Sequence, residues 1–195
     1  MRAFSIHTAF VYLNILIAAM EKDIVNRLAL SPLVSFDLAD YHDAAPRLEI
    51  DIAERLFMGQ ILREKDFRAW IEEHDWQQYE GKHVYMHCTA EAVIPGWAWM
   101  LLAIQLQPFA KTIVKGSSED LEKAIWQKSL ESIDYSVLEG KKIVVKGCGD
   151  IDIPQSAYVD FIVRLRAIAT KLMYGEPCST VPLWKKAKNT AKAAK

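Results

Sequence analysis

The three cysteines of the chain are the residues whose surroundings best suit chemistry. Cys88 and Cys148 each follow an apolar stretch and precede a short acidic loop, and Cys178 lies in the small polar stretch 175–182. Thiolates favour soft ions such as zinc, copper(I) and the iron of iron–sulfur clusters over magnesium or calcium. The three cysteines are therefore a candidate site for a metal ion, a cluster or sulfur.

A zinc site usually takes four ligands, so a fourth residue is expected beside the cysteines. The candidates for that position are His87, Glu91 and Asp150. The wide spacing of the cysteines differs from that of zinc fingers and ferredoxins, and a free cysteine often serves as a small buried hydrophobe. Two other interpretations stay open: a cysteine-dependent hydrolase or transferase, for which no catalytic residue can be assigned, and a non-catalytic interaction protein.

An internal repeat places two of the cysteines in matching contexts. The stretch 81–102 recurs in altered form 59 residues later as 140–159. Each copy has a Gly-Lys turn, an apolar strand, one cysteine, an acidic loop, Ile-Pro and a helix. In a parallel sheet, ligands gather where a strand ends and the next helix begins. The repeat therefore predicts Cys88 and Cys148 at one edge of a sheet, which Cys178 would have to reach by a return of the chain.

The elements that must position these residues follow from hydrophobic periodicity, which predicts an α/β fold. Strands are expected at 82–87, 112–115 and 141–146, alternating with helices at 95–107, 118–131 and 154–173. This alternation indicates a mostly parallel sheet in a two-layer or three-layer sandwich. Pro95 and Pro154 suit the first helical position, where a missing N–H costs nothing.

The region before the repeat has a different pattern. Two alternating segments, 33–38 and 47–52, are predicted to form an antiparallel strand pair. A surface helix is expected at 20–30 and another at 64–76, whereas 53–62 fits a short helix only poorly because Gly59 lies within it.

The helix predicted at 95–107 has no polar face, since Trp97, Trp99 and their neighbours are apolar nearly all round. A helix of this composition is expected to be buried, either by N-terminal elements or by the second copy in a homodimer.

Composition bounds the class of protein. With 195 residues, of which 51% are hydrophobic and 25% charged, the chain has the size of one globular domain. A net charge of -1 provides no attraction to nucleic acid or to an anionic membrane, so neither is expected as a partner. An odd number of cysteines without paired spacing favours a reducing, cytoplasmic compartment.

The two ends of the chain differ from its middle. Residues 1–19 have an apolar run interrupted by polar residues, and we interpret them as a leader or as the result of a start codon assigned too early. A single α/β domain is expected at 20–183. The basic tail 184–195 is expected to be disordered.

Several motifs together carry a family resemblance. They lie at 20–38, 87–100, 146–154 and 173–183. The chain resembles the bacterial domain-of-unknown-function family number 2480 from Met20 to about Lys186. The resemblance implies an accessory role in iron–sulfur cluster assembly, with assembly proteins as partners. The cofactor expected from the cysteines themselves is an iron–sulfur cluster or zinc.

Overall fold

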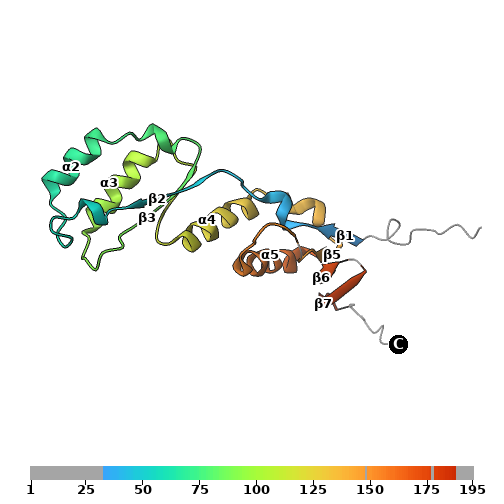
Figure 1. Cartoon of the computed structure of the whole chain (residues 1–195). Helices are drawn as coiled ribbons and strands as arrows, with labels where there is room; N and C mark the ends of the chain where they lie inside the picture. Colours follow the sequence, from blue (N-terminus) through green and yellow to red (C-terminus); the bar gives the residue numbers. More distant parts are fainter. Residues whose placement is uncertain (1–32, 148, 177, 188–195) are drawn as a thin grey trace, which may run out of the picture. The chain divides into compact units, whose positions relative to one another are not determined.

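The computed structural model describes residues 33–147, 149–176 and 178–187 (Figure 1). The leader predicted at 1–19, the helix predicted at 20–30 and most of the predicted tail lie outside the described residues. The described residues from Val34 onward belong to one compact unit, which contains all of the described residues except Leu33.

The secondary structure alternates strands and helices along most of the chain. The strands are β1 (Leu33–Phe36), β2 (Arg47–Asp51), β3 (His83–His87), β4 (Thr112–Lys115), β5 (Lys142–Val145), β6 (Lys171–Glu176) and β7 (Ser179–Lys185). The α-helices are α2 (Glu64–Glu73), α3 (Gly96–Leu106), α4 (Ser118–Glu131) and α5 (Gln155–Ile168). Short 3-10 helices are η1 (Leu38–Tyr41), η2 (Ala53–Arg55), η3 (Gln77–Tyr79) and η4 (Tyr135–Leu138). The predicted α/β class is therefore confirmed.

The strands form two sheets, not the single sheet that we predicted (Figure 1). The first sheet has the order β2-β3-β4, with parallel pairs throughout. The second has the order β1-β5-β6-β7, in which β5 is parallel to β6 and β7 is antiparallel to β6. The predicted antiparallel pair of 33–38 with 47–52 is wrong, because β1 and β2 lie in different sheets. Alternation specifies which face of a strand is buried, but it does not specify the neighbouring strand.

We call β2, α2, β3, α3 and β4 the first module. In it, α2 and α3 share one hydrophobic core with one face of the sheet. Its buried residues are Ile50, Ile52, Leu56, Leu62, Phe67, Ile71, Trp76, Tyr79, Val84, Met86, Ala98, Leu102 and Leu106.

We call β1, α4, β5, α5, β6 and β7 the second module. The first module is inserted into it between β1 and α4. Its separate core is formed by Phe36, Leu38, Trp126, Leu130, Ile133, Leu138, Ile143, Val145, Ala157, Phe161, Leu165, Ala169 and Leu172. Helix α4 contributes to this core and also contacts β3 and β4 of the first module.

The two modules are structural copies related by the repeat. The pairing of β3 with β4 runs from His83↔Thr112 to Met86↔Lys115. The pairing of β5 with β6 runs from Lys142↔Lys171 to Val145↔Tyr174, which is the same register moved along the sequence by 59 residues, as from Gly81 to Gly140. Buried pairs at this separation are Phe67 and Trp126, Ile71 and Leu130, Val84 and Ile143, Met86 and Val145, Ala98 and Ala157, Leu102 and Phe161, and Leu106 and Leu165.

The repeated glycines have a conformational role. Gly81 and Gly140 adopt φ values of 68° and 70°, in the left-handed region where a side chain is strained. Their amides donate to the carbonyl oxygens of Phe109 and Ile168, each at 3.0 Å. The same turn therefore starts the central strand of both modules and joins it to the last residue of α5 in one module and to a residue just after α3 in the other.

The last helix ends earlier than we predicted. It was expected to extend to residue 173, but α5 ends at Ile168, and the amide of Thr170 then donates to the carbonyl oxygen of Lys141 at 2.8 Å. The apolar residues that follow, such as Leu172, belong to β6, where they enter the same core that a longer helix would have used. The segment predicted as a disordered tail begins within β7, which reaches Lys185.

The start of each repeated helix also differs by one residue. Pro95 and Pro154 are the N-cap residues of α3 and α5, with extended ψ values of 141° and 137°, so they precede the first helical position. Segment 53–62 forms no α-helix: η2 is followed by an antiparallel bridge between Phe57 and Ile61.

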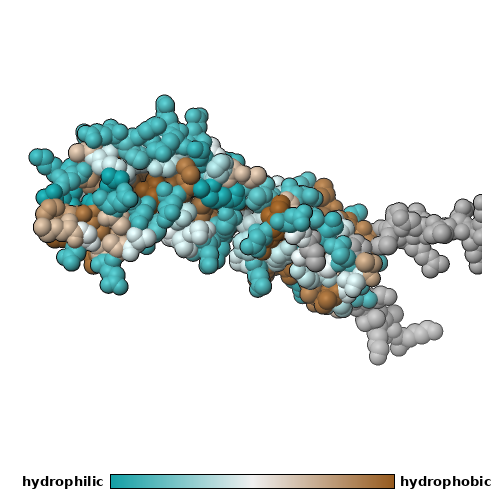
Figure 2. All heavy atoms as spheres, viewed as in Figure 1, coloured by the Kyte–Doolittle hydropathy of each residue, from teal (hydrophilic) through white to brown (hydrophobic). Residues whose placement is uncertain are grey.

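Among the described residues, helix α3 is not covered on all sides, so its covering by a second copy stays a prediction. Met100 and Ile104 are 68% and 67% exposed, and Val93, in the loop before the helix, is 93% exposed. The matching residues of α5, Val159 and Val163, are 61% and 66% exposed. Hydrophobic residues are accordingly visible at the surface in Figure 2. Each module thus buries only one side of its repeated helix.

Candidate functional site

The carboxyl edge of the first module brings together polar side chains from two neighbouring strands. His87, the last residue of β3, is hydrogen-bonded through Nε2 to a carboxylate oxygen of Glu49 on β2. Thr89 follows β3, and its hydroxyl donates to Asp51 Oδ2 at 2.5 Å while its amide donates to Asp51 Oδ1 at 3.1 Å. At this edge, the two residues that flank Cys88 in the sequence are therefore each hydrogen-bonded to a carboxylate.

Asp51 fixes the backbone at this edge. Its Oδ1 also accepts from the amide of Ala53 at 2.9 Å, which starts η2. Burial favours the neutral acid, but the hydrogen bonds from Thr89 and Ala53 outweigh it and lower the pKa of Asp51 below its usual value. Asp51 is thus an ionised carboxylate near neutral pH, and its two oxygens hold the loop that follows β3.

Cys88 lies between His87 and Thr89 in the sequence and is half-buried. Its Sγ donates to the carbonyl oxygen of Ala90 at 3.6 Å, and the side chain packs against the core of the first module. The neighbouring imidazole of His87 is engaged with Glu49. A Cys-His nucleophile pair between these sequence neighbours is therefore not formed.

The carboxyl edge of the second module repeats one part of this arrangement. Asp37 follows β1 as Asp51 ends β2, and its Oδ1 accepts from the amide of Ala39 at 3.0 Å to start η1. Its Oδ2 accepts from Lys146 Nζ at 3.2 Å, in place of the threonine of the first module. Our reading of the sequence missed both aspartates. The signal was present as FDLAD at 36–40 and IDIAE at 50–54.

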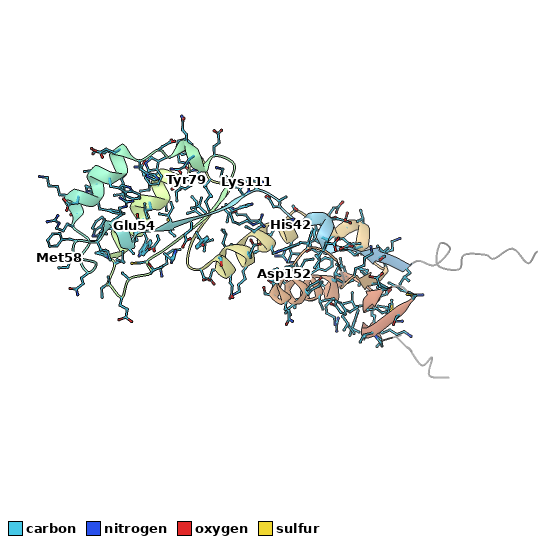
Figure 3. All side chains as sticks on the ribbon, viewed as in Figure 1. His42, Glu54, Met58, Tyr79, Lys111 and Asp152 are labelled. Carbon is cyan, nitrogen blue, oxygen red and sulfur yellow. The ribbon has the colours of Figure 1, made fainter. Side chains whose placement is uncertain are left out.

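A cavity of about 720 Å³ opens at the carboxyl edge of the second module, in front of α5. It is lined by Gly147, Gly149, Asp150, Ile151, Asp152, Ile153, Gln155, Tyr158, Val159 and Tyr174. Figure 3 labels Asp152 beside α5. The rings of Tyr158 and Tyr174 meet edge to face with centroids 5.8 Å apart. Tyr174 approaches Gly147 so closely that a Cβ there would lie 2.1 Å from its hydroxyl oxygen, so residue 147 has to be glycine in this arrangement.

The predicted cysteine site is divided between the two modules. Cys88 follows β3 in the first sheet, whereas Cys178 is exposed in the turn between β6 and β7 of the second. Cys148 lies outside the described residues, between β5 and α5 in the sequence. Among the residues that the structure describes, no group of three histidine, cysteine or acidic side chains is placed to hold a metal ion. Convergence of all three thiols remains a prediction.

The predicted additional ligands are divided in the same way. His87 is paired with Glu49, and Glu91 is exposed in the loop before α3. Asp150 lines the cavity of the second module. The described residues therefore do not gather these three candidates into one coordination sphere.

The fold and these edges define an α/β protein built from two copies of a parallel β-α-β module, each with a polar carboxyl edge. Its helices in the described ranges include none long and apolar enough to cross a membrane. The chain belongs to the family of proteins of unknown function DUF2480, whose profile matches residues 22–186. Comparison with curated proteins gave no match, and comparison with solved structures gave none either.

Proposed function

We propose that the protein is an accessory factor in iron–sulfur cluster assembly that carries sulfur or a soft metal ion on thiols at the carboxyl edges of its modules. The observation that supports this proposal is the position of Cys88 directly after the central strand of a parallel sheet. The repeat gives Cys148 the same sequence context after β5. Ligands of parallel α/β sheets bind at this edge.

The separation of Cys88 and Cys178 favours sulfur transfer over a shared cluster. A cluster needs several protein ligands at one place, whereas a persulfide needs a single thiol. In the proposed step a cysteine thiolate attacks the outer sulfur of a donor persulfide, a new S–S bond forms, and the donor leaves as a thiolate. The assembly protein that supplies the persulfide is the partner that this proposal requires, and an iron–sulfur cluster or zinc is the alternative cargo.

Purification under anaerobic conditions, followed by metal, acid-labile sulfide and persulfide analysis, tests the proposal. Wild type is compared with Cys88→Ser, Cys148→Ser and Cys178→Ser. We expect persulfide labelling to fall in Cys88→Ser and in Cys148→Ser. The Cys178→Ser variant shows whether the exposed thiol that follows β6, at the carboxyl edge of the second module, carries sulfur as well. Stoichiometric iron, sulfide or zinc lost from all three variants would instead indicate a shared metal site. A protein without metal, sulfide or persulfide, unchanged by every substitution, would refute both forms of the proposal.

A second candidate is a non-catalytic homodimer that associates through α3. The exposed residues Met100 and Ile104 favour it, because α3 contains no charged residue and two copies could meet without repulsion. Light scattering of wild type and of Ile104→Lys tests this candidate, with Val163→Lys on α5 as the matched control. A monomer at every concentration would exclude it.

A further inference from the structure

A second polar cluster lies at the opposite end of the first module, away from the carboxyl edge. His83 is the first residue of β3 and is only 2% exposed. Neither ring nitrogen has a well-formed hydrogen bond, although Nε2 lies 3.3 Å from Asp43 Oδ2. A buried imidazole with both nitrogens unsatisfied destabilises a fold, and a bound ligand that pairs with it would remove that cost.

This histidine lines a cavity of about 230 Å³ between the sheet and α4. The lining residues are Asp43, His83, Lys111, Thr112, Ile125, Lys128, Ser129 and Ser132. Lys111 Nζ donates to Asp43 Oδ2 at 2.6 Å. Lys128 Nζ donates to the carbonyl oxygen of Lys111 at 2.9 Å and to Thr112 Oγ1 at 3.1 Å. Figure 3 labels Lys111 beside β2 and α4.

The charges of the lining favour an anion. The hydrogen bond from Lys111 holds the pKa of Asp43 well below its usual range, so this carboxylate is ionised and already paired. Burial lowers the pKa of His83, with an opposing contribution from Asp43, so the imidazole is neutral at pH 7. The two ammonium groups of Lys111 and Lys128 and the carboxylate of Asp43 give the lining a net charge of +1. The nearby Arg47 is neutralised by Glu122, at 2.7 Å.

The donors of the cavity are matched to oxygen ligands. Each ammonium group has three N–H donors and uses only some of them in the bonds above. Thr112, Ser129 and Ser132 lie in the same lining, and the Ser132 hydroxyl already donates to the carbonyl oxygen of Ser129 at 2.7 Å. The carboxylate of Asp43 and the negative end of the α4 dipole would repel an anion. The negative charge of Asp43 is balanced by Lys111. The positive charge of Lys128, in the last turn of α4, balances the negative end of the helix dipole.

Comparison with the second module shows that the fold itself does not require this histidine. The residue matching His83 in register is Lys142, which is exposed at the start of β5. Thr112 is likewise matched by Lys171. The same backbone therefore forms without a buried imidazole. The polar cluster around His83 is not needed for the fold.

We propose that this cavity binds a small oxyanion of the phosphate class, free or as a phosphomonoester. Lys111 and Lys128 supply the charge, the hydroxyl groups of Thr112 and Ser129 donate hydrogen bonds, and His83 donates an N–H from the buried side. Charge-assisted hydrogen bonds of this kind are the strong ones in anion recognition. The site is independent of the thiols in the proposed function, because His83 and His87 stand at opposite ends of β3.

The test uses the full chain, with inorganic phosphate in one titration and glycerol phosphate in another. Binding is followed by calorimetry at constant ionic strength and by the imidazole NMR resonances of His83. We expect phosphate to shift these resonances and to raise the pKa of His83, because a bound anion stabilises the imidazolium. Tighter binding of glycerol phosphate would identify an esterified ligand, and tighter binding of inorganic phosphate a free one.

Two lysines of α4 provide matched variants. Lys128→Met removes a cavity donor and is expected to weaken phosphate binding about tenfold, as the loss of a charge-assisted hydrogen bond does. Lys123→Met removes an exposed lysine of the same helix, paired with Asp120, and is expected to leave affinity unchanged. Equal binding by wild type and Lys128→Met, or His83 resonances unmoved by phosphate in wild type, would overturn the proposal. The wild-type NMR titration decides the question even if a variant fails to fold.

Discussion

The two modules have the same backbone framework but different polar residues. They share the strand register, the left-handed glycine before the central strand, and a proline at the N-cap of the repeated helix. They differ where side chains could act: His83 corresponds to Lys142, and His87 corresponds to Lys146. The shared features specify the fold. The polar residues that differ are those that could give each module its own function.

Core truncation should have the largest effect, and it should be large in both modules. Phe161 is fully buried in the second core, with its ring centroid 4.6 Å from that of Phe36. Phe161→Ala should lower the free energy of unfolding by about 4 kcal/mol, and Leu102→Ala at the matching position by about 3 kcal/mol. Urea denaturation measures both. A loss of well under about 1 kcal/mol in either variant would mean that the two cores are not equivalent.

Removal of the edge aspartates should have a smaller and unequal effect. Asp51 accepts from Thr89 and Ala53, whereas Asp37 accepts from Ala39 and Lys146. We expect Asp51→Ala to cost about 2 kcal/mol and Asp37→Ala about 1 kcal/mol. Thermal unfolding would show the difference. Asp40→Ala is the matched control, because Asp40 is exposed and should be replaceable without loss. An equal cost at positions 37 and 51 would contradict the proposed specialisation of the first edge.

The repeated glycines should give equal effects in the two modules. Nothing lies within 4 Å of a Cβ built at Gly81 or Gly140, so substitution would add only backbone strain. Gly81→Ala and Gly140→Ala should each cost about 1 kcal/mol. Gly96→Ala is the control, since Gly96 begins α3 without a positive φ and also has open space around it. Chemical denaturation of the three variants checks this, and a large difference between the first two would break the structural equivalence.

Acidification should destabilise the first module through His83, which is buried, and His74, which is half-buried. Burial lowers the pKa of His83 and of His74, so in the folded state both bind a proton less readily than in the unfolded state. Their contribution to stability is present above the unfolded pKa of about 6.5 and is lost as the pH falls through the lower folded values. The free energy of unfolding should therefore decrease from pH 7.5 to 5. His83→Gln should reduce this dependence, and an unchanged pH profile would show that His83 titrates normally.

Much of the local structure could be predicted from the sequence. The expected strand 112–115 and helix 118–131 have the observed bounds, because β4 is preceded by a turn and α4 starts with a capping box formed by Ser117 and Asp120. The repeat was also visible in its glycines and prolines. Prediction failed at residues 169–173, where apolar spacing continues from α5 into β6, and periodicity alone cannot separate a helix end from a buried strand.

The candidate sites were predicted less completely. The sequence pointed to Cys88 at a carboxyl edge, and the structure places it there. It did not point to the cluster of Asp43, His83 and Lys111, because these residues are distant in sequence and meet only across the start of the sheet.

The sequence by itself determined the class of fold, the repeated unit and the turns that begin each central strand, because these depend on local conformation and on the period of the apolar residues. Only the tertiary structure decided that β1 and β2 belong to different sheets and that Cys88 and Cys178 lie in different modules. It also decided which polar residues meet around His83. Strand partnership and side-chain clustering depend on contacts between distant segments, and those contacts arise from burial of both cores at once.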